Sequence, residues 1–144
     1  MATITSNDFL TARERHMAVV GGKDIILRCI SALEHLQLFC GYMHTGKLDV
    51  YTKHPGERFN CRVVDSFEGI DFVSIDNVLC TSVSQTINDM LDEIDSIDEQ
   101  PLVESLSKYY YTNKKSFTGL LIKPENMERF NRIKDWAVEY YDEV

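Results

Sequence analysis

Hydrophobic positions in the first third of the chain recur at the three- and four-residue intervals of an α-helix. They predict a helix that begins at Asp8, capped by Ser6 or Asn7, and a second helix over Asp24–Phe39. In the second helix this spacing joins Ile26, Ile30, Leu33 and Leu36. Gly41 then suits a C-terminal cap. The chain is therefore predicted to open with a helix pair.

The middle third changes to short runs with the character of β-strands. These runs are 48–52, 59–64, 71–75 and 78–81. The turn at Pro55–Gly56 predicts that the second run returns as an antiparallel partner of the first, and Asp76–Asn77 predicts a tight turn between the last two. We expect a small antiparallel or mixed sheet of three to five strands.

The last third returns to helical spacing and predicts three helices. Ser82 or Ser84 caps the first, which carries Ile87, Met90, Leu91 and Ile94. Asp98 caps the second, with Pro101 in its first turn, and the third begins near Pro124. An apolar stripe on the third helix is expected to face the sheet, with Trp136 as a packing anchor beside it. The stripe consists of Met127, Phe130, Ile133, Ala137, Tyr140 and Tyr141.

Length and composition agree with one globular domain. The 144 residues are 44% hydrophobic and 26% charged. No apolar run approaches the roughly 20 residues of a membrane helix, and the N-terminus lacks the basic start and apolar core of a signal peptide. We therefore expect one α+β domain over 1–144, in the cytoplasm and without membrane contact. Its sheet is expected to be flanked by the N-terminal helix pair and the three C-terminal helices.

Charge is distributed unevenly along the chain. Lys and Arg number 15 against 23 Asp and Glu, which gives a net charge of −8 and argues against an extended phosphate-binding surface. Residues 1–60 are nearly balanced, so the acidity belongs to 61–144 and is densest over 89–104. A solvated helical face explains such a cluster, and a docking face for a basic protein partner is the functional alternative. The candidate partner-binding residues are Asp92, Glu93, Asp95 and Glu99.

A smaller set of basic residues is the basis of a nucleic-acid-binding alternative. Arg13 and Arg15 form a basic spot near the N-terminus, and Lys114 and Lys115 follow the aromatic run Tyr109–Tyr111. Aromatic rings beside cations bind single-stranded nucleic acid by stacking and charge. Consecutive tyrosines on a helix point in different directions, however, so at least one is expected to face the core. A small nucleic-acid-binding regulator is accordingly the second hypothesis.

No local motif indicates a catalytic, metal or cofactor site. The four cysteines, which lack close metal-ligand pairs, are expected to be buried free thiols; they are Cys29, Cys40, Cys61 and Cys80. The four histidines, His16, His35, His44 and His54, show no i, i+4 pair. Gly21–Lys23 lacks the length and the following Ser or Thr of a phosphate-binding loop. We expect no metal, cofactor or enzymatic activity. A Cys–His nucleophile is the enzymatic alternative, and it predicts a thiol with a lowered pKa.

Two motifs, and the strand pair 48–52 and 62–65 between them, resemble the C-terminal region of AbiEi-type antitoxins, which has extended segments at the place of that pair. Cys29–Leu36 is similar to the helix with a Ser-Ala-Leu signature in that family, and here Ser31, Ala32 and Leu33 carry it. Val78–Leu91 is similar to a second family motif. Its matching residues are Thr81, Ser82, Thr86 and Asp89, and Gln85 stands where arginine is usual. Independently of the family, these residue types suit a structural role. Thr81 ends a strand, Ser82 or Ser84 caps the helix, and Thr86 and Asp89 are expected to bond the first helical turn to neighbouring backbone.

The resemblance implies an antitoxin of a type IV toxin–antitoxin system. Such antitoxins counter a nucleotidyltransferase-like toxin and are usually preceded by an operator-binding winged helix. Too few residues precede the matching region here for that module, so operator binding is not expected. The implied function is a non-enzymatic antitoxin-like protein, whose partner is a cognate toxin or another basic protein. An acidic protein–protein interaction module of unrelated function is a further alternative.

Overall fold

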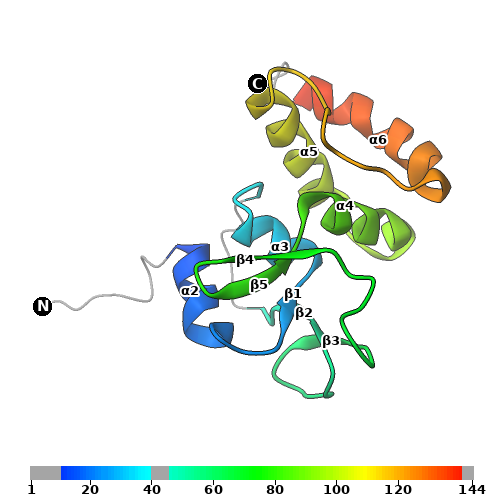
Figure 1. Ribbon diagram of the computed structural model, residues 1–144. Helices are drawn as coiled ribbons and strands as arrows, with labels where there is room; N and C mark the ends of the chain where they lie inside the picture. Colours follow the sequence, from blue (N-terminus) through cyan, green and yellow to red (C-terminus); the bar gives the residue numbers. More distant parts are fainter. Residues whose placement is uncertain (1–10, 40–45, 141–144) are drawn as a thin grey trace, which may run out of the picture.

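The computed structural model describes residues 11–39 and 46–140, and these form an α+β fold (Figure 1). The helices are α2 (Ala12–Val20), α3 (Cys29–His35), α4 (Val83–Asp92), α5 (Gln100–Thr112) and α6 (Met127–Tyr140), with short 3-10 turns η1 (Ile94–Ser96) and η2 (Pro124–Asn126). The strands are β1 (Ile26–Leu27), β2 (Asp49–Thr52), β3 (Asn60–Val63), β4 (Phe72–Ile75) and β5 (Val78–Thr81). The predicted fold class is confirmed.

The five strands form one mixed sheet in the order β3-β2-β1-β5-β4. The central strand β1 is antiparallel to β2 and parallel to β5. β4 and β5 form an antiparallel hairpin, and its turn residues Asp76 and Asn77 both adopt positive φ, of 51° and 64°. Two successive residues with positive φ give the turn type that matches the twist of a hairpin. The predicted tight turn is confirmed.

The predicted helix over Asp24–Phe39 is wrong in its first part, where the chain forms the central strand. Ile26 and Leu27 are fully buried between β2 and β5, and α3 begins only after them. A strand covered on both faces has no alternation of apolar and polar residues, so hydrophobic spacing does not distinguish it from a buried helix. The helix is correspondingly short, and Gly41, its predicted cap, lies outside the described residues.

The predicted antiparallel pairing of the second strand run is also wrong. β3 runs parallel to β2, with Asp49 opposite Asn60 and Thr52 opposite Val63. The chain between the two strands returns along the sheet before β3 begins, so Pro55–Gly56 does not close a hairpin (Figure 1). The loop between β2 and β3 is long enough for this return because each strand has only four residues.

Helix α2 is capped by Thr11, whose hydroxyl accepts a hydrogen bond from the Glu14 backbone, while the Glu14 carboxylate accepts one from the Thr11 backbone. This reciprocal arrangement satisfies two backbone donors at the helix start. The predicted start at Asp8 and the predicted caps Ser6 and Asn7 lie outside the described residues.

The C-terminal helices begin close to the predicted positions. Ser82 caps α4 by accepting a hydrogen bond from the Gln85 backbone, as predicted. The Asp98 carboxylate accepts a bond from the Gln100 backbone, and Pro101 occupies the first turn of α5. The N-cap of α5 is Glu99 and not the predicted Asp98, which lies one residue before it. The turn η2, which begins at Pro124, leads directly into α6.

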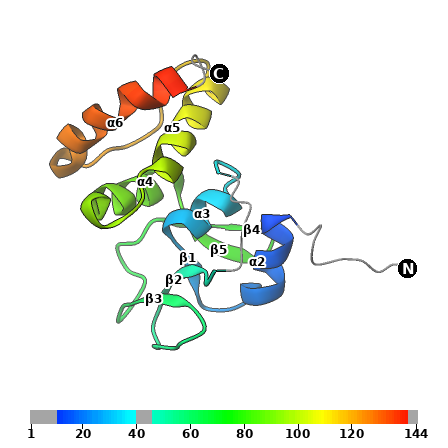
Figure 2. The ribbon, with the colours of Figure 1, turned by 180° about the vertical axis from the view of Figure 1, so that it is seen from behind.

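The apolar stripe of α6 faces the other helices instead of the sheet, which corrects the sequence prediction. Phe130, Ile133 and Ala137 are buried in a cluster with residues of α3, α4 and α5. Figures 1 and 2 show α6 lying along α5, away from the strands. Trp136, the predicted anchor, is 55% exposed, and Met127 is also exposed. The side chains of Tyr140 and Tyr141, the last predicted members of the stripe, lie outside the described residues.

The core has two parts, and α3 contributes to both. One part lies among the helices and includes Leu33, while the other lies on the sheet and includes Ala32. Because α3 lies between the sheet and the group α4–α6, it joins the two (Figure 2). Within residues 11–39 and 46–140, no helix combines the length and hydrophobicity needed to span a lipid bilayer.

Candidate functional site

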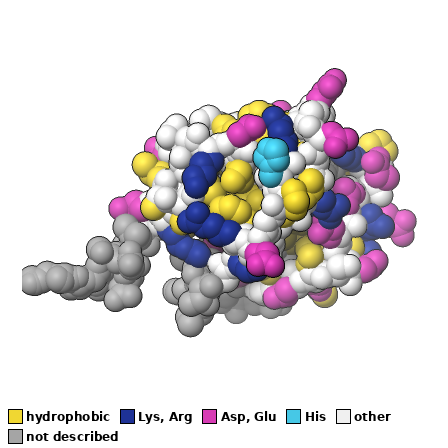
Figure 3. Space-filling model, turned by 90° about the horizontal axis from the view of Figure 1, so that it is seen from below, with side chains coloured by type: hydrophobic (Ala, Val, Ile, Leu, Met, Phe, Trp, Pro, Cys, Tyr) yellow, Lys and Arg dark blue, Asp and Glu magenta, His cyan; other side chains and the backbone are white. Residues whose placement is uncertain are grey.

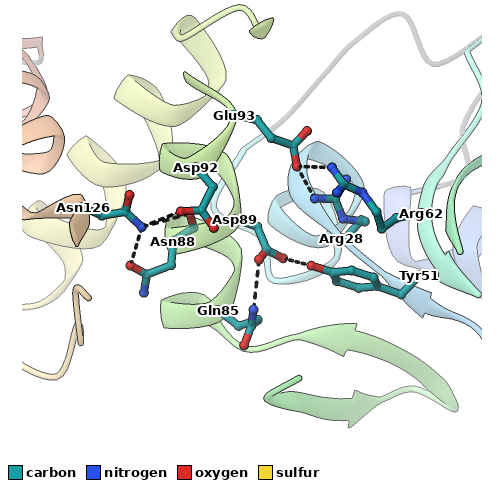
Figure 4. Close-up of polar contacts among 9 residues, drawn as sticks. All are labelled: Arg28, Tyr51, Arg62, Gln85, Asn88, Asp89, Asp92, Glu93 and Asn126. Atoms are coloured by element: carbon teal, nitrogen blue, oxygen red, sulfur yellow. Dashed lines mark hydrogen bonds and ion pairs between the residues drawn. The ribbon is translucent and has the colours of Figure 1, made fainter. Parts of the chain in front are cut away.

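Polar side chains gather where the sheet meets α4, and we call this group the junction cluster (Figure 4). Its members come from the end of β1, from β2, from β3 and from α4 and its C-terminal end. They are Arg28, Tyr51, Arg62, Gln85, Asp89 and Glu93. Strand pairing brings these residues together, because β1 and β3 both lie next to β2. The cluster is therefore a product of the sheet order.

A shared carboxylate forms one half of the junction cluster. Oε2 of Glu93 accepts hydrogen bonds from Nη2 of both Arg28 and Arg62, the second at 3.1 Å. Arg28 is 8% exposed, and its guanidinium carbon lies 4.8 Å from the centre of the Tyr51 ring. Nε of Arg28 is buried without a hydrogen-bond partner. Glu93 therefore neutralises a largely buried cation and links two strands to the end of α4.

The other half is centred on Asp89, which uses both carboxylate oxygens. The Tyr51 hydroxyl donates to Oδ2 at 2.8 Å, and Nε2 of Gln85 donates to Oδ1 at 2.9 Å. Oε1 of Gln85 in turn accepts a bond from the Asp71 backbone at 3.1 Å. These contacts join β2, α4 and the segment before β4. Sequence analysis missed Arg28, Tyr51 and Arg62 because no local pattern indicates which strands will be adjacent.

Burial shapes the ionisation of this cluster. It raises the pKa of the Asp89 carboxyl, against the opposing effect of the bonds from Tyr51 and Gln85. It also raises the pKa of Tyr51 to about 12, with Asp89 adding to the effect. Tyr51 therefore stays protonated at neutral pH and acts as a hydrogen-bond donor. The role that this geometry supports is structural, because the hydrogen bonds fix the position of α4 against the sheet.

The residues of the two family-like motifs have structural contacts. The Thr81 and Thr86 hydroxyls lie 2.6 Å apart, and the Thr86 hydroxyl donates to the Ser82 carbonyl at 2.7 Å. Ser31 accepts a hydrogen bond from the Asp49 backbone at 2.9 Å, while its neighbours Ala32 and Leu33 are fully buried. Asp89 differs from the expected backbone contact, because its partners are the two side chains named above. The motifs therefore join strands to helices.

The structure changes the predicted acidic binding face. Glu93 pairs with the two arginines of the junction cluster, and its side chain is 28% exposed. Asp92 is exposed but accepts a hydrogen bond from Nδ2 of Asn126 at 3.0 Å. Asp95 is exposed in η1 and Glu99 is partly exposed at the start of α5. Partner binding by these carboxylates stays a prediction.

The four basic residues of the nucleic-acid hypothesis do not form one surface. Arg13 donates from Nε to the His35 carbonyl at 2.8 Å, which ties α2 to the end of α3. Lys114 and Lys115 follow α5 at the far end of the helical group, well away from α2 (Figures 1 and 2). Arg15, also on α2, lines a pocket together with Lys47 and Arg58, which were not predicted from the sequence.

The buried cysteines do not fit the nucleophile hypothesis. Burial raises the pKa of Cys29 to about 12 and that of Cys80 to about 11, the opposite of the predicted lowering. Thiols with such values are uncharged at neutral pH and react slowly. Cys61 is half-buried, and Cys40 lies outside the described residues. The hypothesis is therefore wrong for Cys29 and Cys80.

Two histidines form a buried pair between α2 and α3. Nδ1 of His16 lies 3.0 Å from Nδ1 of His35, and Nε2 of His35 lies 2.8 Å from the Ile75 carbonyl. Because a carbonyl only accepts, Nε2 of His35 carries a proton, and its Nδ1 in the neutral ring accepts from His16. Burial lowers the pKa of His35. Among the described residues, including this pair, no three His, Cys, Asp or Glu side chains are arranged to hold a metal ion.

No protein-family model matches the chain, and no curated protein matches it.

Proposed function

We propose that this chain is a non-enzymatic, antitoxin-like protein of a type IV toxin–antitoxin system, which counters a nucleotidyltransferase-like toxin. One observation carries the proposal. The two segments that resemble the antitoxin family lie far apart in the sequence, yet α3 and α4 pack against each other in one core cluster. Motif residues that meet in this way belong to one structural unit, which is what a resemblance based on a shared fold requires.

The hydrogen bonds of the motif residues also support the proposal. Ser31 joins α3 to β2, and Thr86 joins α4 to the end of β5. Asp89 then connects α4 to Tyr51 on β2. Both motifs therefore fix helices to the same sheet, so their residue types serve the architecture and leave the outer surface to vary with the partner.

The surface proposed for the partner is the exposed acidic part of the connection between α4 and α5. Asp95 and Glu99 lie there, next to Asp92, in the half of the chain that holds most of its negative charge. Complementary charge steers association and suppresses wrong partners. A basic toxin surface, or another basic protein, is the partner that this charge favours.

The test is rescue of growth in cells that express the gene adjacent to the one for this chain. Wild-type protein should restore growth if that gene encodes a nucleotidyltransferase-like toxin. The double variant Asp95→Lys/Glu99→Lys should lose rescue, whereas Glu125→Lys/Glu128→Lys, with the same charge change on exposed residues of η2 and α6, should retain it.

Each outcome bears on a separate part of the proposal. Failure of the wild-type protein to rescue would refute the antitoxin function. Full rescue by a folded Asp95→Lys/Glu99→Lys variant would remove the acidic surface and leave the function intact. Folding of every variant is checked by circular dichroism before the comparison.

A further inference from the structure

A pocket of about 250 Å³ lies between α2 and the two segments that lead into β2 and β3. Three segments of the chain each contribute one cation to it: Arg15 from α2, Lys47 before β2 and Arg58 before β3. The remaining lining residues are Val19, Gly46, Leu48 and Phe59. Figure 3 views the molecule from the side of β3 and shows Lys and Arg side chains gathered there beside hydrophobic ones.

Among the described residues, no carboxylate pairs with the positive charge of this pocket. None of the lining residues is acidic, and within the described chain no ion pair joins Arg15, Lys47 or Arg58 to a carboxylate. Other cations of the sheet region do have such partners, as the junction cluster shows, and Lys53 pairs with Asp24 at 3.0 Å. Three cations that line one pocket repel one another, and a bound anion would offset that repulsion. Because the whole chain has a net charge of −8, a local excess of positive charge indicates a specific site for an anion.

The pocket also has an oriented donor and an apolar wall. Nη2 of Arg15 donates to the Gly46 carbonyl at 3.1 Å, which holds the guanidinium in place and leaves its other N–H groups for a ligand. Arg58 lies 5.6 Å from the centre of the Phe59 ring. Phe59, Val19 and Leu48 add apolar surface beside the charges. The combination favours a ligand that carries an anion next to a flat or apolar group.

We propose that this pocket binds the phosphate of a nucleotide, with the attached sugar or base against Phe59. Phosphate suits the site better than a carboxylate because it carries up to two negative charges and matches the fork of arginine donors. Aromatic side chains stack on nucleobases without requiring a particular base. A free nucleotide and a unit of single-stranded RNA present the same chemistry. The inference is independent of the proposed antitoxin function.

Binding is measured with the full chain by isothermal titration calorimetry with AMP and by fluorescence anisotropy with a labelled ten-nucleotide single-stranded RNA. Arg58→Gln, or Lys47→Gln, should weaken binding by about tenfold, the usual effect of losing one charge-assisted bond to an anion. Lys108→Gln changes the charge equally at an exposed site on α5 and should leave binding unchanged. Affinity for the RNA should fall roughly tenfold between 50 and 200 mM salt.

The arms of the experiment separate the two sources of phosphate. Saturable binding of AMP supports a free nucleotide, and binding of RNA without AMP supports a strand. Absence of binding for both probes at 50 mM salt would overturn the proposal. Equal loss with Arg58→Gln and Lys108→Gln, or tighter binding of a polyglutamate peptide than of either nucleotide probe, would also overturn it. Phe59→Leu, which keeps the charges, should weaken binding of both probes severalfold if the wall contacts the ligand.

Discussion

Glu93 accepts hydrogen bonds from two arginines whose burial differs, and this difference determines what each substitution should cost. The side chain of Arg28 is 10% exposed and that of Arg62 is 55% exposed. Glu93→Gln keeps the shape but removes the charge that neutralises Arg28. Breaking a buried ion pair costs about 3–5 kcal/mol. Since the side chain of Glu93 is itself 28% exposed, solvent reduces the expected cost to about 2–3 kcal/mol.

Arg62→Gln is the matched control. It removes an exposed partner of the same carboxylate, and exposed ion pairs contribute about 0–1 kcal/mol. Urea unfolding followed by circular dichroism gives the free energy of unfolding for each variant. For a chain of this size, Glu93→Gln should lower the melting temperature by about 5–10 °C, and Arg62→Gln by no more than about 3 °C.

A double-mutant cycle isolates the buried pair. Arg28→Met alone and Glu93→Gln alone each leave one partner without the other, whereas the double variant removes both charges. The double variant should therefore be more stable than the sum of the two losses predicts. Equal destabilisation by Glu93→Gln and Arg62→Gln, or additive losses for Arg28→Met and Glu93→Gln, would refute the assignment of Glu93 as the counter-ion of a buried arginine.

Two further predictions concern the buried histidine and thiols. Because burial lowers the pKa of His35, the unfolded chain binds a proton more readily, and stability should fall as the pH drops below about 6.5, by at most about 1.4 kcal/mol per pH unit. His35→Gln should flatten this dependence in urea unfolding measured between pH 7.5 and 5.5; an unchanged slope would contradict the reasoning. With iodoacetamide and mass spectrometry of the native protein, Cys61 should be alkylated before Cys29 and Cys80, whose raised pKa values and burial slow the reaction. Faster labelling of either buried thiol would contradict the assignment.

The sequence by itself determined the features that depend on neighbouring residues. Asp76–Asn77 specifies a hairpin turn because these residue types tolerate positive φ, and the two strands it joins adjoin it directly. Ser82 specifies the start of α4 because its hydroxyl reaches a backbone donor only three residues away. The fold class followed from the same local signals, since the change of hydrophobic spacing separates strand from helix.

Only the tertiary structure decided which distant segments meet. Ile26 and Leu27 become the central strand because their backbone pairs with β2 at one edge and with β5 at the other, a condition that their own spacing does not encode. The parallel pairing of β3 likewise depends on the path of a loop. The pairing of Glu93 with Arg28, and the meeting of Arg15, Lys47 and Arg58 around one pocket, depend on how the helices pack on this sheet. Long-range pairing is determined by the burial of the whole chain, so the junction cluster and the basic pocket emerged only in three dimensions.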